Sequence, residues 1–279
     1  MRGGQWQALR LHRGLIERGH ESLLLARKNS PLFAAARREK LPCEVLRPLR
    51  IRSRAFDLVH AHDARSHTMG ALLAVTPLVV SRRVAFPVRR SAISRWKYRR
   101  ARLFLAVSRH VAGQLMDAGV DENRITVVYD GVPVPAEIAH GDKIVAPRTA
   151  DPRKGMALAQ EAARLAGIDI EMSANLDEDL PRARVLVYLT RSEGLGSGIL
   201  LGMAYGVTVI ASKVGGIPEL IDDGVNGILV ANKPEAVAAA LRRTCPGMGH
   251  AARATVIERF TEAHMIEATL GAYNRVLNA

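Results

Sequence analysis

Short apolar runs alternate with longer amphipathic stretches along most of the chain. Apolar residues repeat at helical spacing over 5–18, and good capping residues or glycines bound several other helical patterns. The pattern predicts strands at 22–26, 55–61, 77–81, 103–107, 125–129, 144–146, 168–172, 185–189 and 207–211. It predicts helices at 5–18, 66–75, 109–118, 155–166, 198–205 and 234–243, with two further helices at the end. Strands that alternate with helices indicate βαβ units and a parallel sheet, hence an α/β fold.

A break in this rhythm at 130–143, which holds two prolines and two glycines, predicts a linker. We therefore expect two doubly wound, Rossmann-like domains that face a cleft, at 1–138 and 139–256. A C-terminal helix at 257–279 is expected to pack back on the first domain. Gly3 and Gly4 come with no strand before them, although a doubly wound domain normally opens with one. Either the first domain lacks its first strand or the true start of translation lies upstream.

Composition supports a globular protein, with 279 residues, 48% hydrophobic and 24% charged. The two cysteines, Cys43 and Cys245, are far apart, which argues against a disulfide framework and fits a reducing compartment. No signal peptide opens the chain, and the longest apolar run, 70–80, is too short to span a bilayer. The sequence thus predicts a cytoplasmic protein that is soluble or peripheral on the inner face of the membrane.

Positive charge is concentrated in the first half of the chain. Residues 1–140 hold 25 Lys+Arg and 11 Asp+Glu, which leaves 15 and 16 of the totals of 40 and 27 for the rest. Segment 82–102 contains no acid and mixes basic residues with Phe86, Trp96 and Tyr98. This composition predicts an acceptor or membrane surface made by Arg82, Arg83, Arg89, Arg90, Arg99 and Arg100. A solvated basic face is the alternative, and nucleic acid is a less favoured partner because no nucleic-acid-binding motif accompanies the charge.

The segment 188–219 carries the strongest chemical signal. A strand is followed by Glu193 and by three glycines, Gly194, Gly196 and Gly198, which open a helix. Glycines allow a ligand to approach the backbone, and the start of a helix offers unpaired N–H groups to an anion. Glu193 would accept hydrogen bonds from sugar hydroxyls beside that anion. The alternative is a glycine-rich connection that only permits tight packing.

The same segment resembles the signature region of family 4 retaining glycosyltransferases (glycosyl transferases group 1), which have the GT-B fold. The similar pieces are SEGLGS, GMAYGVTVIAS and VGGIPELIDDGVNGILV, together with DLVHAHD (57–63), AVSRHVAGQL, ITVVYDGV and DPRKG (151–155). Gly3-Gly4 resembles the opening loop of the family.

The resemblance implies a role for each matching residue. Lys154 and Arg148 would hold the donor diphosphate, Glu193 would contact the donor sugar, and His62 of the HD pair would touch the transferred sugar. The implied donor-binding set is Gly3, Gly4, Gly194, Leu195, Gly196, Ser197 and Leu201. Leu201 stands where the second Glu of the E-x7-E motif, which usually holds the ribose, would be. That departure puts nucleotide recognition in doubt.

Three histidines, His60, His62 and His67, cluster after a predicted strand. For His60, a structural role within the strand is the better interpretation. No metal-ligand spacing accompanies them, so we expect no metal and no cofactor, only a nucleotide-sugar co-substrate, with UDP-sugar favoured.

The sequence therefore predicts a retaining, metal-independent glycosyltransferase. It would move a sugar from a nucleotide donor to a lipid-linked or cell-envelope saccharide of the lipopolysaccharide type. The alternatives are a degenerate, non-catalytic member that binds a sugar nucleotide or glycan, and, less favoured, a basic nucleic-acid-binding protein.

Overall fold

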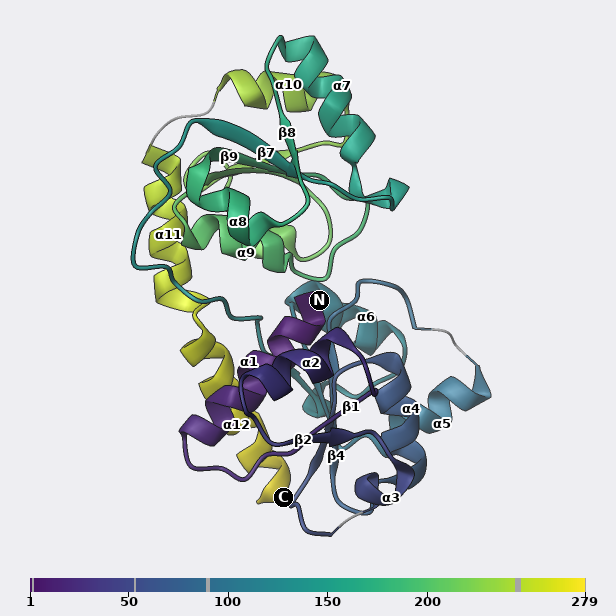
Figure 1. Cartoon of the computed structure of the whole chain (residues 1–279). Helices are drawn as coiled ribbons and strands as arrows, with labels where there is room; N and C mark the ends of the chain where they lie inside the picture. Colours follow the sequence, from purple (N-terminus) through teal and green to yellow (C-terminus); the bar gives the residue numbers. More distant parts are fainter. Residues whose placement is uncertain (2, 53, 89–90, 244–246, 279) are drawn as a thin grey trace. The chain divides into compact units, whose positions relative to one another are not determined.

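The computed structural model describes every residue except 2, 53, 89–90, 244–246 and 279. The chain forms two compact units (Figure 1). The first unit contains Met1–Asp130 and Glu262–Ala279, and the second contains Gly131–Thr261. The chain therefore passes from the first unit to the second and returns to the first for its last helix, α12 (Glu262–Leu277).

The first unit is built on parallel strands in two separate sheets. The larger sheet has the order β3-β4-β5-β6, with β3 Val59–Ala61, β4 Leu78–Arg82, β5 Leu103–Ala106 and β6 Ile125–Val127. The smaller pairs β1 (Leu24–Ala26) with β2 (Cys43–Val45). All four residues of β5 are buried, as expected for a central strand covered on both faces.

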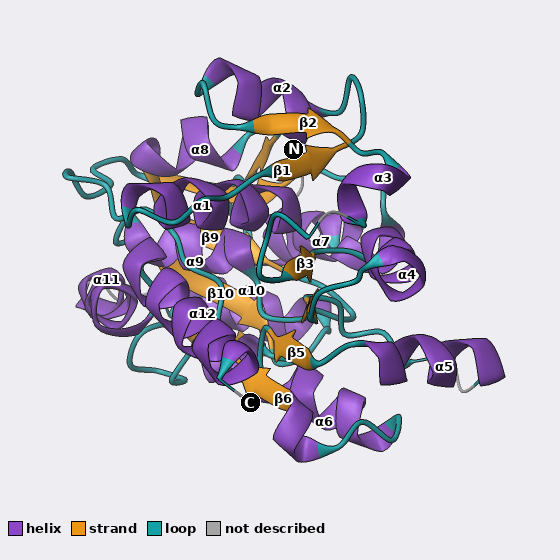
Figure 2. Cartoon of the chain, turned by 90° about the horizontal axis from the view of Figure 1, so that it is seen from below, coloured by secondary structure: helices purple, strands orange, loops and turns teal. Residues whose placement is uncertain are grey.

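Helices cover both faces of the larger sheet of the first unit. One layer is α1 (Gly3–Glu17) and α12, which pack against each other, and α12 also contacts β5. Leu11, Leu105 and Ile266 share the core beneath them. The remaining helices are α2 (Pro31–Arg38), α3 (Pro48–Ile51), α4 (Ala64–Leu73), α5 (Ala92–Arg100) and α6 (Arg109–Asp117). Figures 1 and 2 show α5 projecting from the edge of this unit.

The second unit has one parallel sheet of five strands in the order β11-β10-β9-β7-β8. They are β7 Lys143–Pro147, β8 Glu171–Ser173, β9 Ala183–Tyr188, β10 Thr208–Ser212 and β11 Ile228–Val230. The helices are α7 (Met156–Ala166), α8 (Leu176–Asp179), α9 (Ser197–Ala204), α10 (Pro234–Arg242) and α11 (Gly247–Arg259). Figure 1 shows α7 and α10 on one face of the sheet and α8, α9 and α11 on the other, which is the doubly wound arrangement.

The predicted α/β class with parallel, Rossmann-like sheets is confirmed, and each predicted strand overlaps an observed one. The pattern did not predict α2, α3, α5, α8, β2 or β11. One local expectation is wrong: Gly3 and Gly4 are not a loop but the first turn of α1. The N–H groups of a first turn have no partner within the helix, so glycines cost little there. No strand precedes α1 among the described residues.

Candidate functional site

Two segments of the second unit meet at the carboxyl ends of β7 and β9. A short 3-10 turn after β7, Pro152–Lys154, carries Lys154, and the connection from β9 to α9 carries Glu193. Lys154 Nζ lies 2.6 Å from Glu193 Oε2, and the two side chains are 35% and 17% exposed. The carboxyl edge of a parallel sheet is where doubly wound folds bind their ligands. The sequence therefore identified two residues, 39 positions apart, that share one site.

Tyr188, the last residue of β9, is a hydrogen-bond partner of the Glu193 carboxylate. Its hydroxyl donates to Glu193 Oε2 at 3.2 Å, and Lys154 Nζ lies 5.9 Å from the centre of its ring. Burial, and then the negative charge of Glu193, raise the pKa of Tyr188 well above its ordinary value, so the hydroxyl remains a donor. Both interactions fall on Oε2, and within the described part of the chain no residue donates to Oε1.

The main chain at Glu193 is fixed by a second glycine turn, which follows β10. Gly216 N–H donates to the carbonyl of Glu193 at 3.2 Å. Gly215 has a positive φ of 58°, and a Cβ at this position would lie 2.0 Å from that same carbonyl oxygen. Only a glycine satisfies both conditions. The two glycine turns therefore meet at the same site.

The amino end of α9 opens toward the same loop. Gly196 is its N-cap with φ 111°, and no side chain caps the helix. The Gly196 carbonyl accepts from Ile199 and Leu200, so the helix begins regularly from this glycine. Gly198 lies over the Tyr188 ring, where a Cβ would be 2.9 Å from Cε2. An uncapped helix start one turn after Glu193, with Lys154 close by, is a suitable place for a phosphate group.

Arg148, the second predicted diphosphate ligand, lies just after β7 and is exposed. Its backbone N–H donates to the carbonyl of Ser173 at 2.6 Å. The structure thus places Arg148 at the same sheet edge as Lys154 but gives it no bond to Glu193.

The remaining donor-side predictions divide between exposed and buried positions. Ser197 is the first residue of α9 and is partly exposed, whereas Gly194 is buried. Leu195 and Leu201 are only 2% and 8% exposed, so their side chains belong mainly to the core. A leucine at 201 gives the site no carboxylate at this point of α9.

The first unit has its own cluster of polar side chains at the carboxyl edge of its larger sheet. His62 follows β3, Arg83 follows β4, and Asp130 lies three residues after β6. Arg83 Nε donates to Asp130 Oδ1 at 2.9 Å, and the two side chains are 15% and 8% exposed. Arg83 Nη1 lies 3.3 Å from His62 Nδ1. Gly4 of α1 adjoins this cluster, since a Cβ there would be 3.8 Å from Arg83 Cδ.

The other two histidines of the predicted cluster have structural partners. His60 Nδ1 lies 2.6 Å from the Tyr273 hydroxyl of α12, and its Nε2 lies 2.8 Å from Ser81 Oγ. Burial lowers the pKa of His60 to about 3. His67 in α4 packs edge-on against Tyr98 and Phe104, and burial lowers its pKa to about 4. The structural interpretation of His60 therefore agrees with its contacts.

The predicted basic surface divides into inward-facing and exposed residues. Arg83 is not part of that surface, because its guanidinium is turned to the buried carboxylate of Asp130. Arg82 donates to the Tyr98 hydroxyl at 2.9 Å and to the Phe86 carbonyl. Arg99 and Arg100 are exposed at the end of α5. Arg89 and Arg90 lie outside the described residues.

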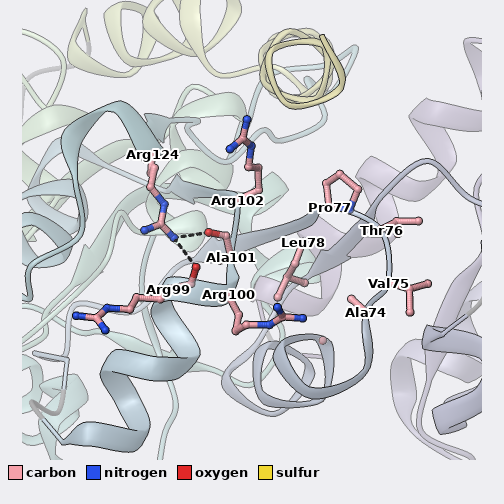
Figure 3. Close-up of a pocket in the computed structure, with 11 residues that line it drawn as sticks. Ala74, Val75, Thr76, Pro77, Leu78, Arg99, Arg100, Ala101, Arg102 and Arg124 are labelled. Atoms are coloured by element: carbon pink, nitrogen blue, oxygen red, sulfur yellow. Dashed lines mark hydrogen bonds between the residues drawn. The ribbon is translucent and has the colours of Figure 1, made fainter. Parts of the chain in front are cut away.

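A hollow of about 470 Å³ opens at the amino ends of the strands of the larger sheet of the first unit (Figure 3). Its lining includes Arg99, Arg100, Arg102 and Arg124. Two of these arginines already donate hydrogen bonds to backbone carbonyls. Arg124 donates to the Tyr98, Arg99 and Ala101 carbonyls at the end of α5, and Arg100 donates to the Ala71 carbonyl near the end of α4. Cations that bond the last carbonyls of a helix stabilise its end. Part of the charge here therefore holds α4 and α5 in place.

Apolar side chains accompany the exposed charge on α5. Ile93 is 78% exposed and Trp96 is 44% exposed, and no described residue of this helix is buried. In the described part of the chain, no helix combines the length and hydropathy needed to cross a bilayer. The same residues contain no group of three His, Cys, Asp or Glu side chains arranged to hold a metal ion.

Two family models match this chain, one for each unit. Residues 1–134 match the model described as Glycosyltransferase Family 4, and residues 151–245 match Glycosyl transferases group 1. Among curated proteins, the chain is similar to α-maltose-1-phosphate synthase of Mycobacterium tuberculosis, with 39% identity over 114 residues. That match covers 36% of this chain and 30% of the relative, so it spans less than a third of the relative's length.

Solved structures match over almost the whole chain. HepE of Anabaena in complex with UDP aligns with a TM-score of 0.85 and 16% identity, covering 98% of this chain and 96% of that one. The apo form of the lipopolysaccharide outer core galactosyltransferase WaaB aligns with a TM-score of 0.71 and 14% identity, and this match also covers 98% of this chain and 96% of that one. At these identities the likeness establishes the fold. The parallel sheets, the family matches to both units and these structural neighbours lead to one conclusion: the chain belongs to the group 1 glycosyltransferases and has the GT-B fold.

Proposed function

We propose that the protein transfers a sugar, with retention of configuration, from a nucleotide-sugar donor to a hydroxyl of a lipid-linked or cell-envelope saccharide. The observation that carries the proposal is the 2.6 Å pair of Lys154 and Glu193 beside the uncapped start of α9. It places one cation, one carboxylate and unpaired backbone amides in a single partly exposed site. A sugar diphosphate needs these three kinds of group. UDP-sugar is the favoured donor, which agrees with the UDP complex of the structurally similar HepE.

Lys154 and the start of α9 would stabilise the departing nucleoside diphosphate. Its β-phosphate gains negative charge as the bond to the sugar breaks, and a positioned cation stabilises that charge. In the structure Lys154 bonds Glu193, so a bound diphosphate would share or replace this partner. Arg148 at the same sheet edge would be the second cation. We propose that these groups supply the charge compensation without a metal ion.

Glu193 would orient the donor sugar rather than attack it. Oε2 is engaged by Lys154 and Tyr188, while Oε1 faces no donor from the described residues. A carboxylate oxygen with free lone pairs accepts hydrogen bonds from sugar hydroxyls.

The proposed reaction keeps the configuration of the anomeric carbon. The acceptor oxygen bonds to that carbon on the face that the diphosphate leaves. The bond from the carbon to the diphosphate oxygen breaks, and the acceptor proton passes to that oxygen. No protein nucleophile takes part in this scheme.

We further propose that the exposed part of the basic segment meets an anionic membrane surface, placing the enzyme on the inner face of the cell membrane. Ile93, Trp96 and the arginines of α5 combine exposed apolar side chains with positive charge on a projecting helix (Figure 2). Such a helix suits the headgroup layer of an anionic membrane, where phosphorylated glycolipid acceptors also lie.

A donor screen tests the first part of the proposal. Thermal-shift and calorimetric titrations with UDP-, GDP- and ADP-sugars should show stabilisation by one nucleotide class, with UDP-sugars expected. Lys154→Met should remove this stabilisation and slow transfer about 10²- to 10³-fold, the range found when one transition-state donor is lost. Turnover that continues unchanged in the presence of EDTA is expected, and a requirement for added metal would contradict the metal-free scheme.

Arg153→Met is the matched control for Lys154. Arg153 is the neighbouring cation, but its guanidinium is paired with Asp151 at 2.7 Å and is exposed. It should retain donor binding. Equal losses in both variants would show that net charge, and not the Lys154 site, binds the donor.

Vesicle sedimentation tests the membrane part. The triple variant Trp96→Ser, Arg95→Ser, Arg99→Ser should bind vesicles containing phosphatidylglycerol several-fold more weakly than the unmodified protein. Arg37→Ser with Arg38→Ser removes two exposed arginines from α2 of the same unit and should have little effect. Vesicle binding that survives the first variant would overturn the membrane proposal.

The position of Leu201 favours a second candidate, a non-catalytic member that binds a sugar nucleotide or glycan. Leu201 is 8% exposed and leaves α9 without the carboxylate expected there. Release of UDP together with a glycosylated product, at catalytic numbers of turnovers, would exclude this alternative. Binding of a UDP-sugar without product over a broad panel of acceptors would support it.

A further inference from the structure

We propose that Arg83, held by Asp130, is a positioning residue that keeps His62 in one neutral tautomer, with Nδ1 as acceptor and Nε2–H as donor to a bound ligand. That the ligand is the transferred sugar rests on the proposed function. The tautomer itself depends only on contacts within the first unit.

The three side chains come from the ends of three strands of one sheet. Arg83 bridges the other two residues, with 2.9 Å from its Nε to Asp130 Oδ1 and 3.3 Å from its Nη1 to His62 Nδ1. The carboxylate is 8% exposed and the guanidinium 15% exposed, so the ion pair is largely shielded from water. A buried guanidinium that is anchored at Nε has little freedom to turn Nη1 away from the histidine.

The chemistry of guanidinium decides which ring nitrogen carries the proton. Arginine has five N–H donors, no acceptor, and does not lose its charge in proteins. His62 Nδ1 must therefore accept from Arg83, and a neutral imidazole that accepts at Nδ1 carries its hydrogen at Nε2. His62 then offers a ligand a donor and not a basic nitrogen.

The groups around His62 keep its ring neutral. His60 in β3 lies 4.0 Å away between ring centres and Arg83 contacts it directly, while His12 of α1 acts on it electrostatically. Asp130, the one acid in the cluster, faces it through Arg83. Burial first, and then these three neighbours, lower the pKa of His62 well below its ordinary value.

His60 adds rigidity to this arrangement without competing for the same role. Both of its ring nitrogens are occupied, by the Tyr273 hydroxyl and by Ser81 Oγ. His62 is therefore the histidine of the pair whose second nitrogen has no described protein partner. The consequence for the proposed reaction is that the neutral His62 ring would offer a ligand the Nε2–H donor.

NMR of the full chain labelled with ¹⁵N-histidine tests the tautomer directly. The His62 signals, assigned with the variant His62→Asn, should show a protonated Nε2 and an unprotonated Nδ1 at pH 7, with no titration down to pH 5. A proton on Nδ1, or protonation of the ring above pH 6, would overturn the proposal.

Two variants test the role of Arg83. Arg83→Gln leaves Asp130 buried without its cation and could fail to fold, so Arg83→Gln with Asp130→Asn removes both charges together. In either variant His62 should lose its fixed tautomer, and its pKa should rise. Arg82→Gln, at the neighbouring arginine, which bonds Tyr98 instead, should leave the His62 tautomer unchanged. An unaltered His62 spectrum in the double variant would show that Arg83 does not position the ring.

The pH dependence of transfer gives the functional readout. In the double variant kcat should fall at neutral pH, where the freed ring can carry its hydrogen on Nδ1, and should recover as acid protonates the ring and restores the Nε2–H donor. The unmodified protein should lack this dependence. A uniform loss of kcat at all pH values would mean a merely structural role and would contradict the proposal. If the NMR result holds while no donor supports turnover, the positioning role stands and the proposed function fails.

Discussion

The two polar clusters of this protein are built in opposite ways. The site in the second unit consists of a partly exposed Lys154–Glu193 pair held by glycine turns. The cluster in the first unit consists of a shielded Arg83–Asp130 pair and of histidines whose ring nitrogens contact other side chains, such as His60 with Tyr273. The difference shows which parts of each cluster tolerate change. In the second unit the main chain sets the geometry, whereas in the first unit a network of buried side chains does.

The largest effect should come from Gly215→Ala, which tests the role of the main chain in the second unit. A Cβ there would lie 2.0 Å from the Glu193 carbonyl oxygen, at a φ of 58°, so the loop must move. We expect donor binding to fall at least about 10²-fold, as misplacing catalytic groups by about 1 Å can do, measured by calorimetry with UDP.

Gly224→Ala is the control for that substitution. Gly224 also has a positive φ, 82°, but nothing lies within 4 Å of the added Cβ. It should cost roughly 1 kcal/mol of stability through backbone strain and leave UDP affinity unchanged. Equal loss of UDP binding in both variants would mean that backbone conformation alone, and not the contact with Glu193, matters.

Glu193→Gln should have the next largest effect. It tests whether Glu193 contacts the sugar while Lys154 binds the diphosphate. The amide keeps the shape of the carboxylate but loses its charge and one acceptor, so kcat/KM should fall about 10- to 10²-fold. UDP should bind at least as well, because Lys154 loses its competing partner. Weaker binding of UDP would indicate that Glu193 contacts the nucleotide and not the sugar.

Acid should weaken the first unit more than the second, because only the first contains buried histidines among the described residues. Folding lowers the pKa of His60 from 6.5 to about 3 and that of His67 to about 4. The unfolded chain therefore takes up protons that the folded unit excludes. The free energy of unfolding is highest above pH 6.5 and decreases as the pH falls from 6.5 toward the folded pKa values of about 3 and 4. At pH 5 the loss is about 2 kcal/mol for each group.

Hydrogen exchange at pH 7 and pH 5, corrected for intrinsic rates, measures this difference. Peptides of β3–β5 should lose protection at pH 5, while those of β9 and β10 change little, since His140 and His250 of the second unit are exposed. Equal loss of protection in both units would argue against the histidines as its cause.

The smallest expected effect is that of Tyr188→Phe. This variant removes one hydrogen bond of 3.2 Å to Glu193 and keeps the ring on which Gly198 packs. Loss of one such long hydrogen bond corresponds to about 0.5–1.5 kcal/mol, which we expect to appear as a few-fold rise in KM for the donor and not in global stability. An unchanged KM with lowered thermal stability would make Tyr188 a packing residue only.

The extent to which the sequence predicts the structure depends on whether the signal is local. Glu193 and the glycines that open α9 lie in one compact motif and were identified from neighbouring residues, whereas Lys154 was implied by the resemblance of DPRKG. Arg83 and Asp130 are 47 positions apart, and the basic run around Arg83 suggested an exposed charge. The pairing follows from strand order, because the ends of β4 and β6 reach the same sheet edge, and it could not be derived from the spacing alone.

Some missed elements did carry a local signal. Ser30 caps α2 by accepting from Phe33 N–H, and Pro31 occupies the first turn, which is a recognisable helix start. The exposed helix α5 is harder to predict, because its last-turn basic residues obscure an amphipathic pattern and no residue of it is buried. Its end is instead fixed by Arg124, from a distant segment.

The return of the chain to the first unit has a consequence for biosynthesis. The second unit, Gly131–Thr261, is one continuous stretch and can complete its sheet while the ribosome still holds the last residues. The first unit cannot, because α12 supplies Tyr273 to His60 and Glu262 to Arg10. The segment made first is therefore finished last, and a nascent chain stalled before Glu262 would expose the apolar surface that α12 covers on α1 and β5.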